Sequence, residues 1–182
     1  MTKRLLTVLV SAALAVAIPA VAADKKLGKS DREFLTEAAS GGLMEVELGQ
    51  VATKNAASDR VKQFGQRMVD DHSKANTELK QVASQESVTV PDSLTPKQRD
   101  QVARLSKLHG AEFDREYMKA MLQDHEEDVP KFRKEASSAS DPKVKDFAAK
   151  TLPTLESHLD MAKSINAEIS GRPTSGTPRS EH

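Results

Sequence analysis

Two histidines of this 182-residue chain end the same short pattern. The first copy is Met68-Val69-Asp70-Asp71-His72, and the second, 53 positions later, is Met121-Leu122-Gln123-Asp124-His125. Imidazole nitrogens bind transition metals, and imidazoles also titrate near neutral pH. The repeat therefore predicts two helices of one domain that present a histidine in the same way.

Both histidines lie on helical stripes where apolar residues are expected. Apolar residues recur every three or four positions along four long segments, which predicts helices over about 30–55, 58–86, 112–138 and 142–170. His158 interrupts the stripe of the fourth segment, and Glu45 interrupts that of the first. The chain is thus predicted to be all-α, an antiparallel four-helix bundle made of two helical hairpins.

Start signals place the helix ends. Ser30-Asp31-Arg32-Glu33 reads as a capping box for the first helix, Ser58 or Asp59 starts the second, and Asp141-Pro142 starts the last. Thr95-Pro96 predicts an extra short helix before the third long helix.

Hairpin geometry predicts that the four polar residues meet. The midpoint of Glu45 and His72 falls between Ser58 and Asp59, and that of His125 and His158 falls between residues 141 and 142. Both midpoints coincide with predicted turns, so the members of each pair are level to within a few residues, at about 1.5 Å per residue. We expect one mid-bundle cluster.

Such a cluster has two interpretations. Glu45, His72, His125 and His158 suit one divalent or redox transition metal (Zn, Fe, Mn or Cu), with Asp71 and Asp124 as outer acceptors that orient the rings. Alternatively, Glu45 pairs with protonated histidines in a structural network, which responds to pH and must be fully hydrogen-bonded to be tolerated.

Glycines and prolines leave further alternatives open. The glycines of the first helix indicate either close approach of a neighbouring helix or room for a ligand beside Glu45. Pro130 and Pro153 each lie five residues from a histidine on the same side of the predicted cluster, and either let the helices bulge around a site or simply kink them.

The ends of the chain predict export. Lys3-Arg4, an apolar run and Ala20-Val21-Ala22 are typical of a signal peptide over residues 1–23, cleaved after Ala22 or Ala23. The bundle domain then spans 24–170, and 171–182 is expected to be a disordered tail. We expect a periplasmic or secreted protein with no transmembrane span in the mature chain.

Composition excludes several classes of function. There are 27 Lys and Arg against 27 Asp and Glu, one Tyr and no Trp, which disfavours nucleic acid as a partner. The absence of cysteine rules out disulfides, thiolate metal sites and thiol nucleophiles.

The motifs around the histidines resemble a known family. Met-Val-Asp-Asp-His72, Phe113-Asp-Arg-Glu-Tyr117 with Asp124-His125-Glu126, and Leu152-Pro153 with His158-Leu159 are similar to a secreted bacterial family catalogued as domain of unknown function 4142, whose members often carry an outer-membrane label. The resemblance implies a ferritin-like fold in the cell envelope and supplies no activity.

Two functions follow from this sequence. The first is an exported bundle that binds a metal through the His/Glu cluster, for storage, sensing or stress protection. The second is a non-enzymatic envelope module that binds an unknown partner protein, with a structural His/Glu network. Di-iron enzymes of ferritin-like fold use Glu-x-x-His, but the positions three before the histidines are Val69, Leu122 and Leu155, so ferroxidase or oxygenase chemistry is not expected. Oligomeric state is not predicted.

Overall fold

The computed structural model describes residues 26–171, and this part of the chain is all-helical, as predicted. Five helices follow one another along the chain: α1 (Lys29–Asn55), α2 (Asp59–Gln85), α3 (Pro96–Ser106), α4 (Gly110–Ser138) and α5 (Pro142–Ile169). The predicted signal peptide and nearly all of the predicted tail lie outside the described residues. Within the described range, no helix is long and apolar enough to cross a bilayer.

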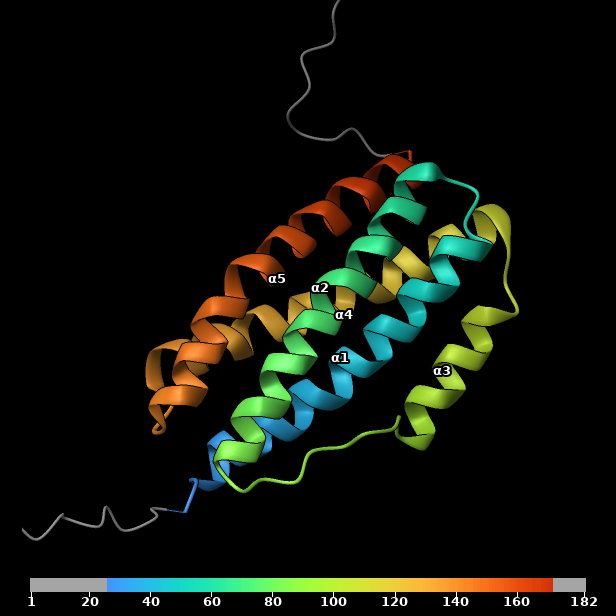
Figure 1. Cartoon of the computed structure of the whole chain (residues 1–182). Helices are drawn as coiled ribbons and strands as arrows, with labels where there is room; N and C mark the ends of the chain where they lie inside the picture. The colour runs from blue at the N-terminus through green and yellow to red at the C-terminus, as the bar shows by residue number, and fades with distance from the viewer. Residues whose placement is uncertain (1–25, 172–182) are drawn as a thin grey trace, which may run out of the picture.

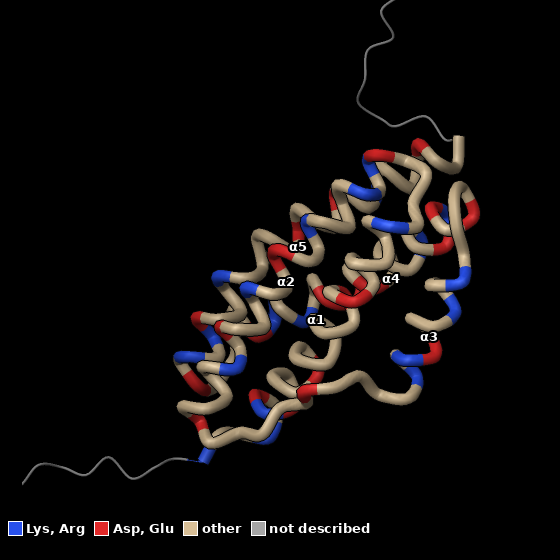
Figure 2. Tube along the Cα trace, turned by 45° about the vertical axis from the view of Figure 1, so that its right-hand side comes forward, with Lys and Arg blue, Asp and Glu red and all other residues tan. Residues whose placement is uncertain are grey.

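The four long helices form two hairpins that pack side by side (Figure 1). Helix α1 packs along α2 and α4 packs along α5, while α2 contacts α5 and α1 contacts α4 across the hairpin interface. The short helix α3 lies along the outer side of α1, where Gln98 Nε2 donates to the carbonyl of Ser40 at 3.0 Å. Lys and Arg are interspersed with Asp and Glu along the helices, as Figure 2 shows.

Two buried aspartates hold the hairpins level. Asp31, in the first turn of α1, accepts hydrogen bonds from the backbone of Ser140 at 3.3 Å and Asp141 at 2.8 Å, in the α4–α5 turn. Asp114, near the start of α4, accepts from Ala57 at 3.1 Å and Ser58 at 2.9 Å, in the α1–α2 turn. Each hairpin thus satisfies the backbone of the other hairpin's turn, which fixes their relative heights.

The predicted caps are partly confirmed. Thr95 and Gln98 form a capping box with Pro96 behind it, and Asp141 caps α5 by accepting from the backbone N–H of residues 143 and 144. The capping box predicted at Ser30 is wrong: α1 begins one residue earlier, after Gly28, and no side chain caps it. The Glu33 carboxylate, which the capping box needs, pairs instead with Lys29 Nζ at 3.6 Å.

The glycines of α1 serve different purposes. A Cβ on Gly49 would lie 2.6 Å from the carbonyl oxygen of Gly65, so these residues allow close approach of α1 and α2. A Cβ on Gly42 would collide with the amide of Asn76. Close approach therefore holds at Gly49, whereas Gly42 makes room for a polar side chain. Pro130 and Pro153 lie inside continuous helices.

The core consists of two apolar clusters with a polar layer between them. One cluster, which includes Phe64 and Tyr117, lies toward the α1–α2 turn, and the other, which includes Phe34 and Phe147, lies toward the α4–α5 turn. A fully buried Leu, Met or Phe contributes about 1.5–3 kcal/mol. In the intervening layer, each of the four long helices has a buried polar residue in place of an apolar one and so lacks this stabilisation.

Candidate metal site

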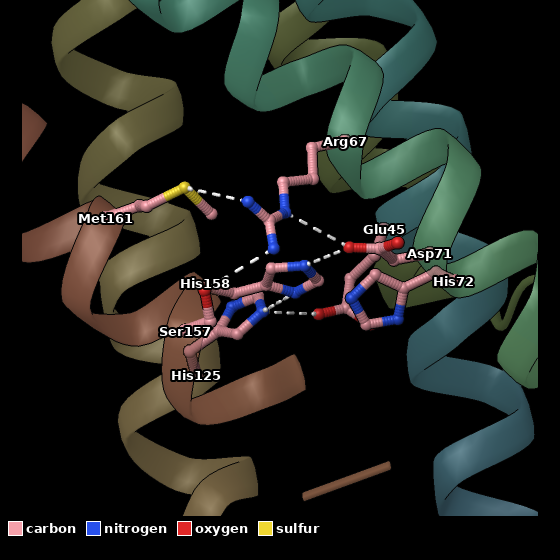
Figure 3. Close-up of polar contacts among 8 residues, drawn as sticks. All are labelled: Glu45, Arg67, Asp71, His72, His125, Ser157, His158 and Met161. Atoms are coloured by element: carbon pink, nitrogen blue, oxygen red, sulfur yellow. Dashed lines mark hydrogen bonds and ion pairs between the residues drawn. The ribbon is translucent and has the colours of Figure 1, made fainter. Parts of the chain in front are cut away.

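The polar layer brings together one residue from each long helix. Glu45 comes from α1, His72 from α2, His125 from α4 and His158 from α5, and their exposures are 2%, 5%, 0% and 0%. The three imidazoles and the carboxylate lie against one another, as Figure 3 shows. The structure thus gathers the four residues that hairpin geometry predicted to meet.

The distances describe a tight cluster. Glu45 Oε2 lies 2.9 Å from His72 Nδ1, and Glu45 Oε1 lies 3.6 Å from His125 Nε2. His125 Nε2 is 3.3 Å from His158 Nδ1. One nitrogen from each of the three rings can be chosen so that all three lie within 4.8 Å of one another.

The outer nitrogens of two rings face groups that only accept hydrogen bonds. His125 Nδ1 lies 3.0 Å from the carbonyl oxygen of Met121, and His158 Nε2 lies 2.8 Å from Asp71 Oδ2. Each outer nitrogen must therefore carry the proton and donate it. In neutral rings this leaves bare lone pairs on His125 Nε2 and His158 Nδ1, which face each other.

His72 follows the same rule. Its Nδ1 donates to the Glu45 carboxylate, so the lone pair is left on Nε2, which is buried without a hydrogen-bond partner among the described residues. Burial lowers the pKa of His72 to about 4 and that of His158 to about 3, and it also lowers the pKa of His125. All three rings are thus neutral at pH 7, and their lone pairs are available.

Asp71 orients a ring, but not the ring of its own neighbour. It bonds His158 across the interface and also accepts from Arg67 Nε at 3.2 Å. Burial alone would raise the pKa of Asp71, but the hydrogen bond from His158, together with the hydrogen bond and charge of Arg67, outweighs it and lowers this pKa. Asp71 is therefore an ionised outer acceptor, as expected for a residue that orients a metal-binding histidine.

Asp124 has a different environment. Its carboxyl faces that of Glu45, and its Oδ2 has no hydrogen-bond partner within the described range. Burial and the negative charges of Glu45 and Asp128 raise the pKa of Asp124 to about 9. Burial also raises the pKa of Glu45 to about 7, although the charge of His125 opposes this. Asp124 therefore carries a proton at neutral pH.

Sequence reasoning missed two residues next to the cluster. Asp128 lies one turn after Asp124 on α4, and burial raises its pKa although Lys131 pairs with it at 3.3 Å. Tyr117 is fully buried with an unpartnered hydroxyl, and burial together with the charge of Glu45 raises its pKa. The spacing of four residues along α4, from Tyr117 to Met121 to His125, could have indicated that Tyr117 lies on the same face as His125.

Residues 16–165 match the family described as "Domain of unknown function (DUF4142)". The chain belongs to this family, which confirms the resemblance seen in the sequence. No curated protein matches the chain.

One solved structure described as the crystal structure of a DUF305 fragment from Deinococcus radiodurans is similar to this chain, with a TM-score of 0.68 and 11% identity. The similarity covers 78% of this chain and 98% of that chain. At this identity the likeness shows the fold alone.

Proposed function

We propose that this protein binds one divalent or redox transition metal ion (Zn, Fe, Mn or Cu) in the bacterial cell envelope, for storage, sensing or stress protection. His72, His125 and His158 bind the ion through nitrogen, and Glu45 Oε1 supplies the fourth ligand. The four long helices act as an antiparallel bundle of ferritin-like type, and the apolar residues three before each histidine argue against di-iron enzyme chemistry.

One observation carries this proposal: the lone pairs of His125 Nε2 and His158 Nδ1 face each other while the protons of both rings point outward. His125 donates to the Met121 carbonyl and His158 donates to Asp71, which fixes in both rings the tautomers that a metal ion requires. Bare nitrogens that face each other at 3.3 Å repel, and a cation between them removes the repulsion.

The spacing also fits an ion. In a tetrahedral site with bonds of about 2.0–2.1 Å, neighbouring ligand atoms lie roughly 3.3 Å apart. The separation of His125 Nε2 from His158 Nδ1 is 3.3 Å, and that from Glu45 Oε1 is 3.6 Å. Small side-chain shifts are therefore enough to close the site.

The alternative is an envelope interaction module with a purely structural network. That network would leave Glu45 Oε1 and His72 Nε2 buried without hydrogen bonds, and each unsatisfied buried group costs about 1–3 kcal/mol. A metal ion bound to Glu45 Oε1 removes this cost at that atom, which favours the metal hypothesis.

The direct test is elemental analysis of the exported protein, purified without a histidine tag. We expect about one equivalent of a transition metal per chain and a rise in melting temperature when the ion is added back after chelation. In His125→Gln we expect loss of the metal. The matched control is His109→Gln, because His109 is an exposed histidine at the start of α4.

Two results would contradict metal binding: less than about a tenth of an equivalent of every transition metal, together with no thermal shift on adding Zn, Mn, Fe or Cu. Export is tested separately. Cell fractionation should place the mature chain outside the cytoplasm, with an N-terminus at Ala23 or Asp24, and a cytoplasmic full-length chain would exclude it.

A further inference from the structure

A surface groove and an interior cavity lie on opposite sides of one side chain. The groove, of about 300 Å³, opens between α1 and α4, and its lining includes Glu37, Gly41, Asp124, Asp128 and Lys131. The cavity, of about 20 Å³, is lined by residues that include Glu45, His72, Asn76 and, again, Asp128. A cavity of this size holds one water molecule or one ion.

The two spaces share three walls, Ala38, Asp128 and Phe132. Asp128 is the charged member of this set, so its side chain borders both the groove and the cavity beside the polar layer. At the inner end, Glu45 Oε1 and His72 Nε2 have no hydrogen-bond partners, although their residues are only 2% and 5% exposed. The shared wall therefore separates a groove lined by carboxylates from a cavity lined by residues with unsatisfied ligand atoms.

The groove side of this wall can open. The ammonium of Lys131 lies 3.3 Å from Asp128 Oδ1, and its side chain is 49% exposed, so it can swing into solvent without disturbing the core. A Cβ on Gly41 would have Asp128 Oδ2, at 3.8 Å, as its nearest neighbour. The α1 wall of the groove is thus open beside the carboxylate.

We propose that Asp128, with Asp124 beside it, forms an outer docking position for a hydrated divalent cation, from which the ion passes to Glu45 and the histidines. This inference rests on the proposed metal function and adds the route by which the site is filled and emptied. The carboxylates replace waters of the entering ion one at a time, and Lys131 leaves Asp128 as the cation arrives. The negative charge of an ionised Asp128 favours cations over anions.

The test follows the rate of metal binding with Co²⁺ as the probe, because tetrahedral Co²⁺ absorbs visible light. In stopped-flow mixing with chelated, metal-free protein, Asp128→Asn should slow loading at least tenfold. It should slow release to a chelator by a similar factor and leave the dissociation constant within about threefold, because the route changes and the final ligands do not. Glu127→Gln is the matched control: Glu127 is the adjacent carboxylate of α4, and it lines a neighbouring groove instead of this one.

A second variant changes shape and not charge. Gly41→Leu fills the groove beside Asp128 and should slow loading and release as Asp128→Asn does.

Lys131→Gln removes the cation that pairs with Asp128, so it should accelerate loading severalfold. Rising ionic strength should slow loading of the wild type more than that of Asp128→Asn.

The outcomes are separable. If both variants load and release Co²⁺ at the rates of Glu127→Gln while the wild type binds it normally, the docking position is wrong and the metal function stands. If the wild type takes up no Co²⁺ or other transition metal, the metal function fails and the route fails with it. Circular dichroism confirms that each variant is folded before its rates are compared.

Discussion

Helices α2 and α4 carry the same Met-x-x-Asp-His pattern, ending at His72 in one copy and at His125 in the other. Both histidines are buried in the polar layer. The aspartates before them differ: Asp71 is one-third exposed and has a lowered pKa, whereas Asp124 is largely buried and has a pKa near 9. The pattern is therefore symmetric in its imidazoles and asymmetric in its charges.

The difference has a local cause. Asp71 follows Arg67 by one helical turn and accepts a hydrogen bond from it, whereas the residue one turn before Asp124 is Ala120. Without a cation one turn before it, Asp124 faces Glu45 and keeps its proton. The α2 repeat thus supplies the charged Asp71 that orients the His158 ring, and the α4 repeat supplies the neutral carboxyl of Asp124 beside the cluster.

The largest effect should appear in metal affinity when each aspartate is replaced by asparagine. Asp71→Asn removes the carboxylate that holds the His158 proton, so we expect affinity to fall about 10–100-fold. Asp124→Asn should change affinity by less than about threefold, because a protonated carboxyl has no charge to lose. Competition titration with a chromophoric chelator measures both, and equal losses would show that the aspartates are equivalent after all.

An intermediate effect should appear in the stability of the metal-free protein between pH 7 and 9. The folded state keeps a proton on Asp124 up to about pH 9, whereas the unfolded chain releases it near pH 4, so this group destabilises the fold increasingly as pH rises. Above pH 7 the histidines are neutral in both states and do not add to this slope.

Asp124→Asn should therefore lose less stability than the wild type over that range, by roughly 2 kcal/mol. Urea unfolding at several pH values, with chelator present, gives the free energy of unfolding. Asp71→Asn is the matched control, because its pKa is lowered and it stays ionised throughout this range. Parallel curves for the wild type and Asp124→Asn would mean that Asp124 is ionised at neutral pH.

The sequence predicted the helices and the height of the cluster because both depend on local periodicity. Stripe positions placed Glu45 and the histidines inside, and the hairpin midpoints placed them level. The hydrogen-bond acceptors around the cluster could not be predicted from the sequence, because they depend on contacts between the two hairpins. His158 takes its acceptor from α2, and Asp31 accepts from the backbone of a turn 110 residues away.

The smallest effect should come from exchanging the residue one turn before each aspartate. Arg67 is about half exposed, so Arg67→Ala should cost only a few tenths of a kcal/mol in stability. Ala120→Arg places a cation one turn before Asp124, which should lower the pKa of that carboxyl and reduce the alkaline loss of stability, again by a few tenths of a kcal/mol. The measurement is the same urea unfolding between pH 7 and 9, with Lys119→Arg as the control because it adds no charge at the neighbouring exposed position. If Ala120→Arg leaves the slope unchanged, the environment of Asp124 is set by Glu45 and burial alone, and the missing arginine does not explain the asymmetry of the repeats.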